Sequence, residues 1–272
     1  MRQDKATVSL TIFMIPTDRL RQRRFDRSPL GRGHRLGSRK IPGAQEPQHL
    51  VLSFSPDGQR IASAAGVGGG GGSKRASDDG IRIWNVARVQ PDVLTLRGKA
   101  GVQFSALAFS PDSGQLAAVG SDGNLKRWDV RSGQELDGPQ STAGPIACVA
   151  YDAIGRLMAT GGLDGMVRFY NLDTGQPVRT LREPQGAIAA LAFSPNGSSL
   201  ASRSGSWTVR IWELSTGQPR LTLEGDDGFE SGIAWSPDGN WVVAGNHDES
   251  LKLWNASTGR LLHTGDAHAS RS

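Results

Sequence analysis

The chain has 272 residues, of which 37% are apolar, 21% are charged and 36 are glycine. This length and apolar content are sufficient for a sizeable hydrophobic core. The single cysteine, Cys148, excludes an internal disulfide framework and a cysteine-based zinc site, and it favours a reducing compartment, so we expect a cytoplasmic protein. No apolar run approaches the roughly 18–20 residues of a membrane-spanning helix, so we expect no membrane association.

The net charge of +5 is distributed unevenly along the chain. Residues 1–45 contain eleven Lys and Arg against three Asp, a net charge of +8, which leaves −3 for the remainder. The basic character therefore belongs to the N-terminal segment. A nucleic-acid partner is accordingly expected only through residues 1–45.

The first 46 residues contain no repeat and form a basic extension. Residues 19–40 are rich in Arg, Gly and Ser without periodicity, which predicts disorder, whereas residues 7–15 are apolar enough for one strand. Three interpretations stay open for this extension. It is a basic arm for acidic partners or nucleic acid, a solvated leader without a role, or the source of a strand over residues 7–15 that adds to the edge of a later sheet.

After this extension, a pattern of turn, apolar run, turn and aromatic residue occurs five times. Its first marker is a tight turn of the form Phe-Ser-Pro-Asp-Gly, in which Pro fixes φ and Asp can bond its own backbone. The aromatic residue that opens this marker stands at five positions: Phe54, Phe109, Tyr151, Phe193 and Trp235. The last four positions are evenly spaced, and this constant interval indicates a structural repeat.

A second marker keeps the same interval from its second copy onward. It is an aromatic residue at the end of a strand-like run: Trp84, Trp128, Tyr170, Trp212 and Trp254. Each unit of about forty residues then holds three chain reversals and room for four strands. We predict five such units, at about residues 49–96, 103–138, 145–182, 187–224 and 229–264.

The first unit carries a glycine-rich insertion at residues 66–76. A phosphate-binding loop needs Gly-Lys-Ser or Gly-Lys-Thr at the start of a helix that follows a strand. Here Lys74 follows Ser73 instead, and no helix is predicted after it. A flexible surface loop is the better interpretation.

These markers resemble the WD40 family of β-propeller repeats, with the dipeptide itself at Trp128-Asp129 and variants of it at the other four aromatic positions. The resemblance covers about residues 48–266. It implies an all-β fold of five four-stranded blades around an axis, each packed against its neighbours. We therefore expect a basic extension at 1–46, a repeat domain at 47–266 and a C-terminal tail at 267–272.

The number of blades leaves the closure of the ring open. Members of the family usually close with seven blades, and five are recognisable here. A closed five-bladed ring, an incomplete or open arc, and closure by association with another chain remain as alternatives. An open arc would expose apolar blade faces and strand edges.

In this family a turn Asp, a loop His and a second-strand Ser or Thr form a buried hydrogen-bond relay to the aromatic residue. The resemblance places the Asp at Asp78, Asp122, Asp164 and Asp248, whereas the fourth unit has Ser206. The corresponding places lack the His. We therefore expect the blades to depend on apolar packing and turn geometry, with each turn Asp capping backbone N–H groups.

Residue types that could support catalysis or metal binding are not grouped in the sequence. Cys148 lies in an apolar run that predicts a buried inner strand, where a cysteine acts as a small apolar residue. The histidines show no metal-ligand spacing. They are His34, His49, His247, His263 and His268. We expect no enzyme activity, no cofactor and no metal site.

The resemblance implies a non-enzymatic scaffold or adaptor that binds protein partners. In such a propeller, the turns between the second and third strands share one face with the connections between blades. On that face we predict a partner-binding surface of Lys74, Arg75, Trp207, Phe229, Glu230 and His247. For Trp207 two interpretations stay open: an exposed aromatic side chain of the kind enriched at binding hot spots, or a side chain folded back over Arg203 or a neighbouring loop.

Two alternative functions remain. The first is a nucleic-acid-associated protein that acts through the Arg-rich N-terminal tail. The second is a fragment of a larger signalling protein, since bacterial arrays of this family are often linked to kinase or nucleotide-hydrolase domains.

Overall fold

The computed structural model describes residues 50–65, 80–86, 93–97, 101–136, 142, 144–205, 208–224, 232–245 and 250–266. In these ranges the regular elements are all strands, and they form five antiparallel sheets of four, which we call blades 1 to 5. The all-β fold class expected from the sequence is confirmed. No helix in the described ranges is long and apolar enough to cross a membrane.

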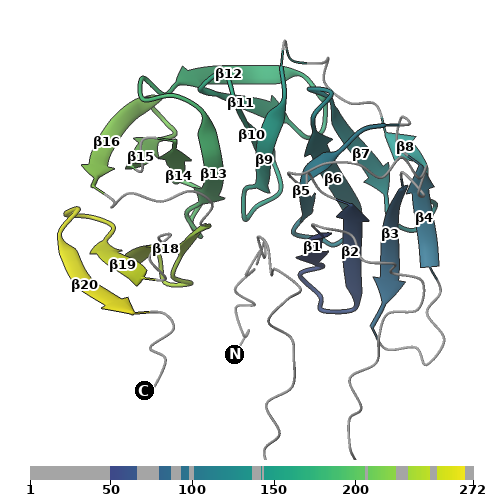
Figure 1. Cartoon of the computed structure of the whole chain (residues 1–272), viewed down its shortest axis with the longest axis horizontal. Coiled ribbons are helices and arrows are strands. Elements are labelled where there is room, and N and C mark those ends of the chain that lie inside the picture. Colours follow the sequence, from purple (N-terminus) through teal and green to yellow (C-terminus); the bar gives the residue numbers. More distant parts are fainter. Residues whose placement is uncertain are drawn as a thin grey trace, which may run out of the picture.

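The blades follow one another in chain order, and each is built from four consecutive strands (Figure 1). Blade 1 contains β1 (Leu50–Phe54), β2 (Arg60–Ala65), β3 (Gly80–Asn85) and β4 (Val93–Arg97). Blade 2 contains β5 (Phe104–Phe109), β6 (Gln115–Gly120), β7 (Leu125–Asp129) and β8 (Glu135–Leu136). Blade 3 contains β9 (Ile146–Tyr151), β10 (Leu157–Gly162), β11 (Met166–Asn171) and β12 (Pro177–Arg182). Blade 4 contains β13 (Ile188–Phe193), β14 (Ser199–Ser204), β15 (Val209–Glu213) and β16 (Gln218–Leu223). Blade 5 contains β17 (Ile233–Trp235), β18 (Trp241–Gly245), β19 (Ser250–Asn255) and β20 (Leu261–Asp266).

The Ser-Pro turns close the first hairpin of blades 1, 2, 4 and 5 in the same way. In blade 1 the Ser55 carbonyl accepts the N–H of Gly58, and the Ser55 hydroxyl oxygen accepts the N–H of Arg60 at 2.9 Å. Gly58 has a φ of 69°, a left-handed conformation that glycine adopts without strain. Blade 2 places Ser113, with a φ of 60°, at this position. The turn chemistry thus sets where each first strand ends.

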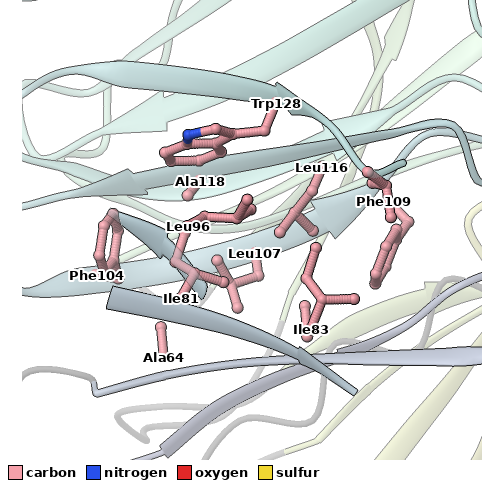
Figure 2. Close-up of a cluster of buried hydrophobic side chains, with 12 residues drawn as sticks. Ala64, Ile81, Ile83, Leu96, Phe104, Leu107, Phe109, Leu116, Ala118 and Trp128 are labelled. Atoms are coloured by element: carbon pink, nitrogen blue, oxygen red, sulfur yellow. The ribbon is translucent and has the colours of Figure 1, made fainter. Parts of the chain in front are cut away.

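Every blade has two faces that differ in what they contact. We call the side that carries the third-strand aromatic residue the aromatic face and the other side the rear face. In blades 2 to 5 the aromatic face packs on the rear face of the preceding blade, in four separate apolar clusters. Figure 2 shows the first of these, where Ile81 and Ile83 of blade 1 meet Leu107 and Leu116 of blade 2 beneath Trp128. The core of the protein is therefore distributed between the blades.

The blades form an open arc (Figure 1). The innermost strands pack in sequence, β1 on β5, β5 on β9, β9 on β13 and β13 on β17. In the described part of the chain no comparable packing joins β17 to β1. Of the closure alternatives left by the sequence, this structure corresponds to the open one.

Arginine side chains add a second kind of contact between neighbouring blades. Arg127 of blade 2 donates from Nη1 to the carbonyl of Leu172 at 3.0 Å. Similar bonds run from Arg179 to the Leu214 carbonyl at 2.7 Å and from Arg220 to the Ala256 carbonyl at 2.8 Å. The three acceptors hold the same position in successive repeats, two residues after the third-strand aromatic residue. A hydrogen bond to a charged donor is stronger than one between neutral groups, so these bonds help to hold blades 2 to 5 together.

Candidate interaction face

The antiparallel topology brings one set of described turns and connections to the same end of the blades. The turns between the second and third strands leave this end, and so do the connections between blades. We call this end the loop face. Its described residues are 101–103, 121–124, 142, 144–145, 163–165, 183–187, 205, 208, 224 and 232.

Backbone hydrogen bonds hold the loop face in a repeated geometry. The N–H of Ser121 donates to the Gln103 carbonyl at 2.9 Å. The same bond joins Leu163 to Pro145 at 3.1 Å in blade 3, and Gly205 to Ala187 at 2.7 Å in blade 4. Donors and acceptors alike occupy the same repeat positions in the three blades. Each turn is therefore anchored to the connection that enters its own blade.

Two glycines permit the close approach of neighbouring blades on this face. Gly123 and Gly165 have φ values of 70° and 76°. A Cβ atom at Gly165 would lie 2.9 Å from the Gly186 carbonyl oxygen, and one at Gly123 would lie 2.6 Å from the Gly144 carbonyl oxygen. The Gly165 carbonyl also accepts the N–H of Glu183 at 2.8 Å. Only glycine satisfies both the left-handed backbone and the contact.

Leu163 is a large apolar side chain exposed on the loop face of blade 3. It is 55% exposed, although its N–H is anchored to Pro145. The connections on the same face contain the exposed residues Pro145, Pro184 and Gln185. The repeat places the polar Ser121 and the side-chain-free Gly205 at the equivalent positions of blades 2 and 4. Leu163 is therefore a protruding apolar group on a fixed backbone.

Charged side chains beside Leu163 are paired. Arg168 contacts the Asp164 carboxylate through both terminal nitrogens, at 2.5 and 3.2 Å. This charged hydrogen bond lowers the pKa of Asp164 below its usual range. The carboxylate also accepts the N–H of Met166 at 3.0 Å, so Asp164 caps its own turn. The buried Glu183 forms an ion pair with Arg210 of blade 4 at 3.1 Å.

The third-strand aromatic residues lie between blades, not on the loop face. The side chains of Trp128, Tyr170, Trp212 and Trp254 are buried, whereas Trp84 is partly exposed. Trp212 donates from Nε1 to the hydroxyl of Ser202 at 2.8 Å, and Trp84 donates to Ser63 at 2.9 Å. Blades 2 and 5 have Ala118 and Ala244 in place of that serine. Asp122 and Asp164 accept backbone N–H groups of their own turns.

Several predicted site residues lie outside the described residues. They are Lys74, Arg75, Asp78, Trp207, Phe229, Glu230, His247 and Asp248. The sequence analysis did not single out Leu163. A signal was available, because this turn has an apolar residue where the neighbouring repeats have Ser and Gly. The sequence analysis also missed the interblade arginine bonds, because their donors do not recur at one repeat position.

The cysteine on an inner strand is buried and protonated. Cys148 lies in β9, and burial raises the pKa of its thiol to about 12, so the thiolate needed for nucleophilic attack is absent at neutral pH. Within the described ranges no three His, Cys, Asp or Glu side chains are placed to hold a metal ion.

A pocket of about 450 Å³ opens between blades 4 and 5, at the end opposite the loop face. The Ser-Pro turns of both blades form its walls, and their polar side chains include Asn196, Asp238 and Asn240. Arg220 also lines it, but this guanidinium donates to the Ala256 carbonyl of the next blade. The pocket is thus part of the contact between two blades.

Comparison with protein families gives a match to the model described as WD domain, G-beta repeat, over residues 91–129, 131–171, 175–213 and 217–255. These segments make up more than half of the chain. Each begins close to the outer strand of one blade and ends with the third strand of the next. A comparison with curated proteins found no match.

Proposed function

The chain belongs to the WD40 repeat family, and we propose that it is a non-enzymatic scaffold that binds a protein partner through its loop face. The observation that carries this proposal is the exposure of Leu163 above a backbone anchored by hydrogen bonds. WD40 arrays commonly act as interaction scaffolds, which agrees with such a surface.

The surroundings of Leu163 resemble the centre of a protein interface. Interfaces bind mainly through a few apolar or aromatic anchors within a polar rim. Here the polar group next to Leu163 is the Asp164–Arg168 pair, whose two side chains already bond to each other. Because the turn is anchored, little conformational freedom remains to be lost when a partner binds.

The predicted surface of Lys74, Arg75, Trp207, Phe229, Glu230 and His247 extends this proposal to blades 1, 4 and 5. The family resemblance is the basis for assigning these residues to turns and connections on the same face as Leu163. We therefore propose that the partner spans several blades, with Leu163 at the middle blade of the arc.

The test is affinity capture with the full chain and two variants. Leu163→Asp places a charge at the centre of the proposed surface. Val178→Asp is the matched control, because Val178 is 56% exposed but lies on the outer strand β12. A protein retained by the wild type and by Val178→Asp is expected to bind Leu163→Asp about 10-fold or more weakly. Equal binding by all three chains contradicts the proposed face.

A second candidate function rests on the net charge of +8 in residues 1–45. We propose as the alternative that this segment binds nucleic acid, in which case affinity falls steeply with added salt. Titration of labelled RNA and duplex DNA into the full chain and a chain lacking residues 1–45 tests it. Binding that survives the deletion, or that ignores salt, eliminates this alternative.

A further inference from the structure

We propose that the two end faces of the arc join head to tail, so that blade 5 of one copy packs on blade 1 of a second copy. Within the chain, every interface between blades pairs a rear face with the aromatic face of the following blade. The aromatic face of blade 1 and the rear face of blade 5 have no such partner among the described blades. These two faces are the complementary halves of the interface that the chain repeats four times.

The aromatic face of blade 1 keeps the residues of a blade interface. Phe54, Ile61 and Trp84 lie on it, since Phe54 pairs with Ile61 and Ile61 with Trp84 across the sheet. In blade 2 the same register positions hold Phe109 and Leu116, paired with each other, and Trp128. Phe54 is 42% exposed, whereas Phe109 is 3% exposed. The difference arises because blade 1 covers Phe109 and no described blade covers Phe54.

The rear face of blade 5 shows the same relationship. Trp241, Val243, Leu251 and Leu253 lie on it, each one repeat after a residue of the rear face of blade 4. Those residues are Ser199, Ala201, Val209 and Ile211, and all four are buried. Leu251 is 42% exposed, whereas Val209 is 1% exposed. Blade 5 therefore presents the apolar face that blade 4 uses to hold the next blade.

A second copy of the chain is the occupant that both faces fit. Exposed apolar patches of this kind mark interaction sites. The rear face of blade 5 continues the pattern of the established contact between blades 4 and 5, in which Ala201, Val209 and Ile211 receive Trp254 and Val242. In a second copy, Trp84 and Ile61 would take the corresponding places. Because the two faces differ, the contact is heterologous. Repeated contacts of this kind form either a closed ring or an open chain of copies.

The test uses two variants that block one face each. Phe54→Asp places a charge on the blade 1 face, and Leu251→Asp places one on the blade 5 face. Both positions are exposed in the single chain, so circular dichroism melting is expected to show folding like the wild type. Sedimentation velocity is expected to show concentration-dependent assembly of the wild type and of the control Val178→Asp, and monomers for each blocked variant alone.

Mixing the two blocked variants gives the decisive measurement. The Phe54→Asp chain retains an intact blade 5 face, and the Leu251→Asp chain retains an intact blade 1 face. A one-to-one mixture is therefore expected to form a heterodimer and no larger species. A wild type that stays monomeric at its highest soluble concentration overturns the proposal. Self-association of each blocked variant to the same extent as the wild type also overturns the proposal, because the copies would then contact one another through other surfaces.

Discussion

The indole nitrogen of Trp212 donates a hydrogen bond to the hydroxyl of Ser202, 2.8 Å away, between two strands of blade 4. Both side chains are buried, with Ser202 fully enclosed. The same bond in blade 1, from Trp84 to Ser63, lies on a face that no described blade covers. The same indole–serine hydrogen bond is thus present once in a buried and once in a partly exposed environment. Comparing the two separates the effect of burying the indole from that of the hydrogen bond.

Ser202→Ala is expected to destabilise the protein by about 1–3 kcal/mol, because it leaves a buried indole N–H without its acceptor. Ser63→Ala removes the same bond where the indole is partly exposed, so its effect should be smaller. Urea denaturation of both variants, followed by fluorescence, measures the difference. Equal destabilisation by the two substitutions would show that burial of the indole is unimportant.

Trp128→Ala is expected to destabilise by roughly 3–5 kcal/mol, the usual cost of emptying a buried aromatic site. Trp128 is 1% exposed, between blades 1 and 2. Trp84→Ala should have a smaller effect, since that side chain is partly exposed on the end face of blade 1. Thermal melting of both variants tests the order, and a near-zero shift for Trp128→Ala contradicts the packing described above.

Gly165→Ala is expected to destabilise by about 1–3 kcal/mol from backbone strain at its φ of 76° and by more from the contact with the Gly186 carbonyl. Gly58→Ala provides the control. Its φ is 69°, but no atom lies within 4 Å of the Cβ position. Chemical denaturation should show the larger loss for Gly165→Ala, and indistinguishable losses would mean that the neighbouring connection moves away freely.

The pH dependence of stability follows from the turn aspartates. The Ser110 hydroxyl and the Gly114 N–H donate to the Asp112 carboxylate and lower its pKa below the ordinary 3.8. The pKa of Asp164 is lowered in the same direction by Arg168. A folded-state pKa below the unfolded value stabilises the protein above the ordinary pKa, and this contribution is lost as pH falls through the lowered value. Melting temperature is therefore expected to fall on acidification below about pH 4.

Asp112→Asn isolates the contribution of one turn. Asn196 holds the equivalent position in blade 4, where its Oδ1 accepts hydrogen bonds from Ser194 at 2.7 Å and Ser198 at 3.0 Å, so asparagine suits the turn. Because it does not titrate, the variant should lose less melting temperature between neutral and acidic pH than the wild type. An identical pH profile would exclude Asp112 as a contributor.

The blades and their shared interface were predictable from the sequence. Predicted and observed blades differ by a few residues, for example 187–224 against 188–223 for blade 4. The turn markers from Phe109 onward and the aromatic residues from Trp128 to Trp254 recur at one constant interval, and each turn marker closes one hairpin. The family resemblance added the expectation that these aromatic residues lie between blades.

Part of the candidate site could not be predicted. The family resemblance implied that the turns between second and third strands share one face, but the exposure of Leu163 depends on how the neighbouring connections lie. The bonds from Arg127, Arg179 and Arg220 also escaped prediction, because each joins two blades through a donor whose strand position is not shared by all three.

The sequence by itself determined the number of recognisable blades and the order of their strands, since these depend on short-range alternation and turn chemistry. Only the tertiary structure decided that the described blades of one chain form an open arc and that Phe54 and Leu251 face outward. The reason is geometric. Closure depends on the rotation from one blade to the next, which accumulates over four interfaces and is set by side-chain packing between sheets that no local pattern records.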